Sequence, residues 1–181
     1  MRENKKPIGR RGLIIVNTGY GKGKTSAALG VALRAIGHGY KVCIIQFIKG
    51  KVTAGEHKIA SRLAPHYEII PMGKGFTWLS KNLEEDKSMA QRAWNLVKEK
   101  ISSNQYNIII LDEITYPINL KWIELEDVLK TLKNKPPMLH IILTGRDAPR
   151  ELIDIADLVT EMRLIKHPYE KGIFGQRGIE F

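Results

Sequence analysis

The sequence predicts an α/β fold in which a mostly parallel β-sheet carries helices on both faces. Two observations support this. Short runs rich in Ile and Val alternate with segments of helical periodicity, and these runs are apolar throughout rather than at every second residue. Continuous apolar strands are typical of parallel sheets that helices cover on both faces. The strand–helix alternation further implies right-handed crossovers between parallel strands.

The expected elements follow in chain order. The expected strands are the apolar runs at residues 13–16, 42–47, 67–70, 107–111 and 139–143. A helix is expected at residues 25–36, because this segment is rich in Ala and Leu and ends at the glycine signal around His38. Asn82, with Glu85 three residues later, is typical of a capping box that starts a second helix.

The later helices are predicted from apolar stripes. The stripe of the second helix consists of Met89, Ala93, Trp94, Val97 and Ile101. The stripe of the third consists of Leu125, Val128, Leu129 and Leu132. Pro136 and Pro137 end the third helix, and a fourth is expected at residues 147–156 with Pro149 near its first turn.

The chain has 181 residues, about the length of one domain. We expect a single domain at residues 12–181, preceded by a basic flexible arm at residues 1–11 and ending in an irregular tail from residue 166. The net charge is +10, of which the arm carries +4. A basic chain attracts phosphate-bearing partners.

Composition excludes several other classes of protein. The hydrophobic share of 43% is too high for a disordered chain. No apolar run approaches the roughly 18 residues of a membrane span. Cys43 is the chain's one cysteine, so it can form no internal disulfide, and no Cys/His spacing suggests a zinc site. A cytoplasmic protein without a membrane partner is expected.

A glycine-rich segment, TGYGKGKT at residues 18–25, follows the first expected strand and opens the first helix. This is the context of a phosphate-binding P-loop, in which backbone N–H groups and the helix N-terminus face phosphate oxygens. Lys24 is expected to neutralise phosphate charge, and the Thr25 hydroxyl to coordinate Mg²⁺. The expected nucleotide-binding residues are Gly19, Tyr20, Gly21, Lys22, Gly23, Lys24, Thr25 and Ser26. The fold expected is therefore that of a RecA-like P-loop NTPase.

Two acids, Asp112 and Glu113, directly follow the fourth apolar run. Carboxylates at the carboxyl end of a central parallel strand can reach a Mg²⁺ ion held by Thr25. In a hydrolase the second acid commonly activates water, whereas in a transferase it holds the metal. Alternatively, the two acids cap the next helix or pair with a surface lysine.

Other unusual segments also follow expected strands, at residues 46–50, 72–78 and 144–146. Because the carboxyl ends of parallel strands share one edge of a sheet, we expect these segments to converge on the P-loop. Phe76 and Trp78 are unexpected in a Gly-rich, polar loop. They either pack the loop onto the core or form an apolar wall for a second, flat substrate.

Taken together, these segments resemble the P-loop family of ATP:cob(I)alamin (corrinoid) adenosyltransferases. The blocks that match in order and spacing are TGYGKGKT (18–25), RAIGHG (34–39), QFIKG (46–50), GFTW (75–78), LDEITY (111–116), TGR (144–146) and GQRGIEF (175–181). Thr18, in place of a glycine, is usual in that family. Tyr20 is commonly Asn there, and Gly175 is commonly Ala.

The resemblance implies a reaction and its participants. The 5′-deoxyadenosyl group of ATP moves to Co(I) of a corrinoid, either cobalamin or cobyrinic acid a,c-diamide, with release of triphosphate, in adenosylcobalamin biosynthesis or salvage. Thr25 and Glu113 are implied to hold Mg²⁺, with Asp112 as a further candidate. Phe76 and Trp78 are implied to displace the lower axial ligand of cobalt. No residue acts as an acid or base, because the nucleophile carries no proton.

The resemblance also implies partners: an external reductant such as a flavoprotein, a second copy in a homodimer, and no specific nucleic acid. Three alternatives remain at the level of sequence. The net charge of +10 and the acid pair favour a RecA-like nucleic-acid-dependent ATPase. A nucleoside or nucleotide kinase requires an Arg-rich lid, for which the sequence offers no candidate. The third alternative is a nucleotide-binding module without activity.

Overall fold

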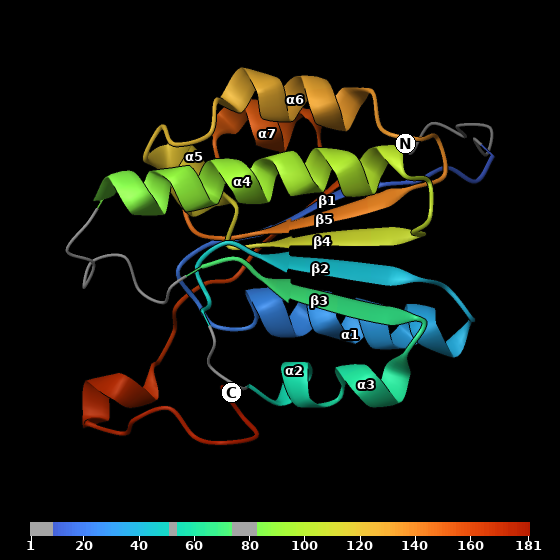
Figure 1. Ribbon diagram of the computed structural model, residues 1–181. Helices are drawn as coiled ribbons and strands as arrows, with labels where there is room; N and C mark the ends of the chain where they lie inside the picture. Colours follow the sequence, from blue (N-terminus) through green and yellow to red (C-terminus); the bar gives the residue numbers. More distant parts are fainter. Residues whose placement is uncertain (1–8, 51–53, 74–82) are drawn as a thin grey trace, which may run out of the picture.

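Residues 9–50, 54–73 and 83–181 are described by the computed structural model, and they form a six-stranded parallel sheet between layers of helices (Figure 1). The strands are β1 Ile14–Thr18, β2 Val42–Gln46, β3 Tyr67–Pro71, β4 Ile108–Asp112, β5 His140–Thr144 and β6 Leu158–Glu161. Their order is β3-β2-β4-β5-β1-β6, and every neighbouring pair is parallel. The five expected strands are confirmed. The edge strand β6 was not expected, because its four residues are all exposed and form no apolar run.

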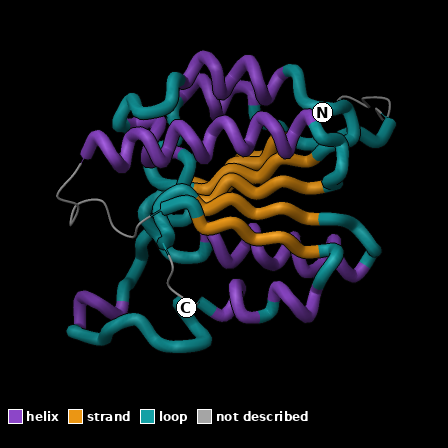
Figure 2. The backbone as a smooth tube through the Cα atoms, in the orientation of Figure 1, coloured by secondary structure: helices purple, strands orange, loops and turns teal. Residues whose placement is uncertain are grey.

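Helices lie on both faces of the sheet, with α4, α6 and α7 on one side and α1, α2 and α3 on the other (Figures 1 and 2). Their bounds are α1 Lys24–Gly37, α2 Gly55–Lys58, α3 Ala60–Leu63, α4 Leu83–Ser102, α5 Thr115–Asn119, α6 Leu125–Lys133 and α7 Arg150–Ile155, with a 3₁₀ turn, η2, at Pro168–Lys171. The four expected helices are confirmed as α1, α4, α6 and α7. Within the described residues, no helix has the length and apolar character needed to span a membrane.

The helix α7 begins later than the sequence suggested. Asp147 has a φ of 51°, and Pro149 is extended at φ −54° and ψ 143°, so the chain becomes helical only at Arg150. The helices α2, α3 and α5 are only four or five residues long, too short for an apolar stripe to be recognised.

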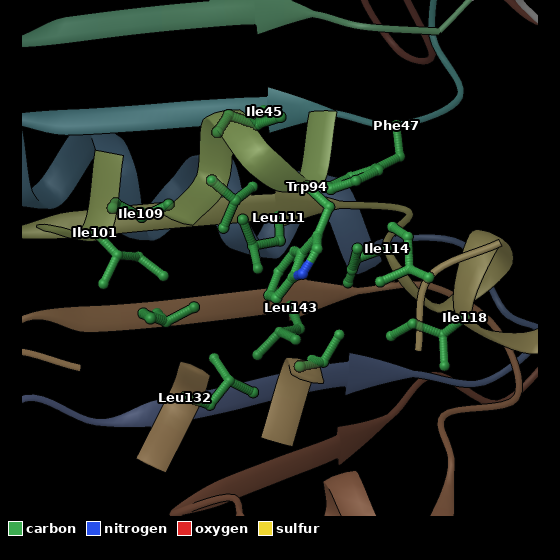
Figure 3. Packing of buried hydrophobic residues seen from close by; sticks show 14 of the residues in the cluster. Ile45, Phe47, Trp94, Ile101, Ile109, Leu111, Ile114, Ile118, Leu132 and Leu143 are labelled. Atoms are coloured by element: carbon green, nitrogen blue, oxygen red, sulfur yellow. The ribbon is translucent and has the colours of Figure 1, made fainter. Parts of the chain in front are cut away.

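Successive residues of the central strands point to opposite faces and fill two hydrophobic clusters. In β4, Ile109 and Leu111 belong to the cluster under α4, whereas Ile108 and Ile110 belong to the cluster against α1. Trp94 packs in the first cluster among β-strand side chains (Figure 3), and its indole nitrogen donates a hydrogen bond of 2.7 Å to a carboxylate of α6. Both faces of the sheet are therefore buried, which explains why the strands are apolar throughout.

Polar side chains interrupt this apolar core at the carboxyl ends of neighbouring strands. Gln46 ends β2, Asp112 ends β4 and Thr144 ends β5, and each is at most 1% exposed. Buried polar groups of this kind require hydrogen-bond partners. Those partners define the site described next.

Candidate functional site

The loop between β1 and α1 curls around the side chain of its own lysine. The buried Lys24 ammonium donates hydrogen bonds to the carbonyl oxygens of Gly19, at 2.7 Å, and Gly21, at 2.9 Å. Burial lowers the pKa of Lys24, while the nearby Glu113 carboxylate opposes this effect. The loop thus presents a cation at the N-terminus of α1, where backbone N–H groups also favour an anion.

Two glycines of this loop are required by a close approach of the chain that follows β6. A Cβ atom on Gly19 would lie 2.6 Å from the carbonyl oxygen of Met162, and one on Gly21 would lie 2.6 Å from that of Arg163. Gly19 also has a φ of +93°, which L side chains rarely adopt. The Gly21 amide donates to the Met162 carbonyl at 2.7 Å. The P-loop is therefore fixed directly onto residues 162–163.

Asp112 connects the P-loop to three strands of the sheet. Its Oδ1 accepts hydrogen bonds from the hydroxyls of Thr25, at 2.7 Å, and Thr144, at 2.8 Å. Its Oδ2 accepts from the Gln46 amide nitrogen at 3.1 Å. Because Thr25 donates its proton to Asp112, the lone pairs of the Thr25 hydroxyl remain for a cation.

This network continues from Asp112 to the short helix α2. The side-chain oxygen Oε1 of Gln46 lies 2.6 Å from His57 Nε2. Since the Gln46 amide nitrogen donates to Asp112, its oxygen is the acceptor and His57 Nε2 the donor. On the same helix, Glu56 accepts from the Lys49 ammonium at 2.9 Å, and that ammonium lies 4.0 Å from Asp112 Oδ2. The network thus positions the helix α2 at the edge of the sheet.

Glu113 differs from Asp112 in its backbone and in its surroundings. Its φ of +61° lies in the left-handed region, and its amide donates to the Thr144 hydroxyl at 2.9 Å. Burial raises the pKa of Glu113, as does the adjacent Asp112 carboxylate, whereas Lys24 and Arg146 oppose both effects. A residue other than glycine in this conformation is costly and is often found at functional sites.

A cleft of about 880 Å³ opens above these groups, within the range typical of small-molecule sites. Its walls come from the P-loop and α1, from α2 with the residue that follows it, from the segments after β2, β4 and β5, and from the chain after β6. The lining residues are Tyr20, Gly21, Lys22, Gly23, Lys24, Thr25, Ser26, Leu29, Lys49, Gly55, Glu56, Ile59, Glu113, Arg146, His167, Gly178, Ile179, Glu180 and Phe181. Asp112 is not part of this lining, consistent with its 1% exposure.

Two contacts hold the Tyr20 side chain at the rim of the cleft, one at its hydroxyl and one at its ring. Its hydroxyl donates to Asp147 Oδ2 at 2.9 Å, and this contact raises the pKa of Tyr20. The guanidinium carbon of Arg146 lies 5.6 Å from the centre of the Tyr20 ring, a cation–π arrangement. The pair links the P-loop to the segment after β5.

The structure brings most of the expected site residues together. Seven of the eight expected nucleotide-binding residues line the cleft, and Gly19 contributes the carbonyl that Lys24 contacts. The expected convergence of post-strand segments is confirmed for Gln46, Asp112 and Thr144 by their hydrogen bonds. Phe76 and Trp78 lie outside the described residues.

Two parts of the site were not predicted from the sequence. Glu56 and His57 lie on a helix too short to show periodicity, and residues 178–181 belong to the expected irregular tail. The position of Lys49 shortly after a strand was the available signal for Glu56 and His57. No pattern of charge or periodicity indicated residues 178–181.

The oxygen donors of the site fit a Mg²⁺ ion that arrives with a substrate phosphate. Within the described ranges, no group of three or more His, Cys, Asp or Glu side chains could hold a metal ion. The available donors are the Thr25 hydroxyl and the Glu113 carboxylate, both at the cleft. Mg²⁺ typically takes one or two protein oxygens and completes its octahedron with phosphate and water.

A P-loop at the start of a helix, with a buried aspartate that accepts from its threonine, defines a P-loop nucleotide-binding protein. The chain belongs to the family "ATP:corrinoid adenosyltransferase BtuR/CobO/CobP", whose sequence model matches residues 10–181. It is 43% identical over 176 residues to a corrinoid adenosyltransferase of Sinorhizobium sp., covering 94% of this chain and 81% of the relative. It is 41% identical over 172 residues to the Escherichia coli K12 corrinoid adenosyltransferase, covering 94% and 86%.

Solved structures support the fold. The flagellar accessory protein FlaH from Methanocaldococcus jannaschii matches with a TM-score of 0.53 and 17% identity, over 83% of this chain and 70% of that protein. The RadB recombinase matches with a TM-score of 0.53 and 15% identity, over 87% and 77%. These similarities concern the fold alone, and the expected P-loop α/β architecture is confirmed.

Proposed function

We propose that this chain transfers the 5′-deoxyadenosyl group of ATP to Co(I) of a corrinoid and releases triphosphate. The corrinoid is cobalamin or cobyrinic acid a,c-diamide, in adenosylcobalamin biosynthesis or salvage. The observation that carries the proposal is the family match over residues 10–181, together with relatives above 40% identity that are named corrinoid adenosyltransferases. The cleft around the P-loop supports it, because that cleft offers the cations and N–H groups that a triphosphate requires.

The reaction is a displacement at carbon. The electron pair of Co(I) forms a bond to C5′. The bond between C5′ and its oxygen breaks, and the triphosphate leaves with the electron pair of that C5′–O bond. The metal centre of the corrinoid is thereby oxidised from Co(I) to Co(III), so electrons balance within the transfer step. No proton moves, and no side chain needs to act as an acid or base.

The chain's own residues orient ATP and stabilise the leaving group. Lys24 and the P-loop N–H groups hold the phosphates, which fixes C5′ for in-line attack and stabilises the growing negative charge. Thr25 and Glu113 would hold Mg²⁺, and Asp112 orients the Thr25 hydroxyl. The ion, when bound, withdraws negative charge from the triphosphate. When ATP binds, the Lys24 ammonium must give up its hydrogen bonds to the Gly19 and Gly21 carbonyl oxygens and contact phosphate oxygens instead.

Further parts of the proposal rest on the family alone. Phe76 and Trp78 form the wall that displaces the lower axial ligand of cobalt, which makes Co(II) easier to reduce. An external reductant such as a flavoprotein supplies the electron. The protein acts in the cytoplasm as a homodimer, without a specific nucleic acid.

The test is product analysis under anaerobic conditions, with ATP, Mg²⁺ and chemically reduced cobalamin. We expect adenosylcobalamin and triphosphate in equal amounts, and neither product when Co(I) is omitted. Rapid formation of ADP without corrinoid would instead identify a nucleic-acid-dependent ATPase. The likeness to RadB does not favour that alternative, because it shows the fold alone.

A further inference from the structure

The closing block of the chain, residues 175–181, lies against the P-loop although the proposed chemistry gives it no role. The Glu180 carboxylate forms an ion pair with the Lys22 ammonium. A tight turn supports this contact: the amides of Ile179 and Glu180 donate to the Gln176 carbonyl, at 3.1 and 2.9 Å, and Gly178 donates to the Phe181 carbonyl at 2.8 Å. Residues 178–181 line the same cleft as the P-loop and α2, and Figure 1 shows the C-terminus near α2.

Four cations line the cleft, and they are unequally free to meet a phosphate. Lys24 belongs to the P-loop, and Lys49 and Arg146 follow the strands β2 and β5, whereas Lys22 pairs with Glu180. Of the three acidic side chains in the lining, Glu56 pairs with Lys49, and Glu113 is the proposed metal ligand. Glu180 is the third. A carboxylate repels a triphosphate, so Glu180 fits a part of the nucleotide that carries no charge.

Apolar side chains lie near Glu180 in the sequence and across the cleft. Ile179 is 78% exposed and Phe181 is 47% exposed, which is unusual for neighbouring large apolar residues in a cleft wall. Leu29 of α1 and Ile59, which follows α2, line the same cleft. A nucleotide combines the matching properties: a charged phosphate chain, a hydroxylated sugar and a flat apolar base.

We propose that residues 178–181 form the nucleoside-binding wall of the cleft, in which Glu180 accepts hydrogen bonds from the ribose hydroxyls and Ile179 and Phe181 flank the base. Lys22 orients the Glu180 carboxylate through one oxygen. A carboxylate has about four lone-pair sites, so the ion pair leaves capacity for the 2′- and 3′-hydroxyls. This inference rests on the proposed function only in taking ATP as the nucleotide.

The test compares the affinities of the full chain for ATP, 2′-deoxy-ATP, 3′-deoxy-ATP and inorganic triphosphate, all with Mg²⁺. We expect wild-type protein to bind ATP more tightly than at least one deoxy analogue. Glu180→Ala should weaken ATP binding on the order of tenfold and remove that preference, because the charged acceptor is lost. Its affinity for inorganic triphosphate should stay equal or rise, since a nearby negative charge is gone. Glu180→Gln retains an acceptor and should lose less.

Two further variants separate ribose binding from other roles. Glu170→Ala removes an exposed acid of η2 outside the cleft and should match wild type with all four ligands. Lys22→Met tests whether Glu180 acts only through the ion pair. In that case Lys22→Met and Glu180→Ala would both weaken the binding of triphosphate and of ATP to the same extent. An equal loss of ATP, deoxy-ATP and triphosphate in Glu180→Ala overturns the proposal. The readout is binding, so the absence of adenosyl transfer would refute the proposed function and leave this result unaffected.

Discussion

Asp112 and Glu113 are neighbours in sequence, yet their carboxylates face different surroundings. Asp112 is 1% exposed and accepts from Thr25, Thr144 and Gln46, whereas Glu113 lines the cleft. The left-handed backbone of Glu113, at φ +61°, separates the two side chains. One acid therefore orients the P-loop threonine, and the other is free to contact a metal.

If Glu113 holds Mg²⁺, Glu113→Gln should weaken Mg²⁺-dependent ATP binding at least on the order of tenfold, a loss typical even of outer-shell partners of a metal. Raised Mg²⁺ should restore part of the transfer rate, and ATP binding without metal should not change. Titration calorimetry at several Mg²⁺ concentrations measures this. Glu124→Gln, at the exposed start of α6, is the control. An unchanged rate of adenosyl transfer at every Mg²⁺ concentration would show that Glu113 does not bind the metal.

Phe76 and Trp78 lie outside the described residues, so their two alternative roles are distinguished by experiment. If they form the corrinoid wall, Phe76→Ala and Trp78→Ala should reduce transfer from Co(II) far more than transfer from chemically prepared Co(I). The reason is that Co(I) already lacks the lower ligand that the wall displaces. If the two residues pack the core, each variant should lose about 3–5 kcal/mol of stability and both activities together. Thermal melting and the two transfer rates decide between these outcomes.

At the scale of elements, replacing either of two glycines by alanine should change the stability of the fold, in opposite directions. Gly30 lies within α1, and a Cβ there meets nothing within 4 Å, so Gly30→Ala should raise the free energy of unfolding by about 0.5–1 kcal/mol. Gly21→Ala places a Cβ 2.6 Å from the Arg163 carbonyl and should lower it by about 1–3 kcal/mol. It should also weaken ATP binding, since the loop must shift. Urea unfolding checks both, and a neutral Gly21→Ala would contradict the close packing described.

The strand β5 begins with a histidine whose protonation should weaken the fold. Burial, followed by the Lys135 charge, lowers the pKa of His140 from 6.5, and its Nδ1 accepts from the Leu13 amide at 3.2 Å. Below about pH 6.5 the unfolded chain binds a proton that the folded chain resists. The free energy of unfolding should therefore fall as the pH drops from about 7.5 to about 5.5. It should fall less in His140→Gln, and parallel pH profiles for the two proteins would refute this role.

Sequence patterns predicted those elements whose burial requires a run or a stripe of apolar residues. The four inner strands and the edge strand β3 all contain apolar runs, and the polar residues at their ends were located because parallel strands end at one edge of the sheet. The strand β6 was missed, since an exposed edge strand needs no apolar residues. The role of Asp112 as an acceptor for Thr25 could not be deduced, because it depends on side-chain directions across three strands.

At the scale of the whole molecule, strand order assembles the site. The strands β2, β4, β5 and β1 are consecutive in the sheet, so Gln46, Asp112, Thr144 and the P-loop meet although they lie between residues 18 and 144 of the sequence. The chain after β6 then returns across the P-loop and adds the last wall of the cleft. Residues from both ends of the chain therefore contribute to one binding site.

The basic arm offers a test of what the net charge does. Residues 1–11 carry +4 of the +10 charge, so a chain that begins at Gly12 has a net charge of +6. Among its described contacts, the arm pairs Arg11 with Asp157, an exposed ion pair that contributes about 0–1 kcal/mol. We expect the shortened protein to keep its melting temperature within a few degrees and to keep its ATP affinity, because none of the arm's described residues lines the cleft.

Polynucleotide binding should respond differently to the same deletion. Any such binding by the full chain should be weak and independent of sequence. Its affinity should fall steeply with salt, because each phosphate contact releases counterions. Removing the basic residues of the arm should lower both the affinity and the salt slope, by roughly one unit for each lost contact. Fluorescence anisotropy with two unrelated single-stranded DNAs, from low to physiological salt, measures the slope. Tight binding to one sequence that also stimulated ATP turnover would show that the charge serves nucleic-acid recognition, and the proposed adenosyl transfer would then be wrong.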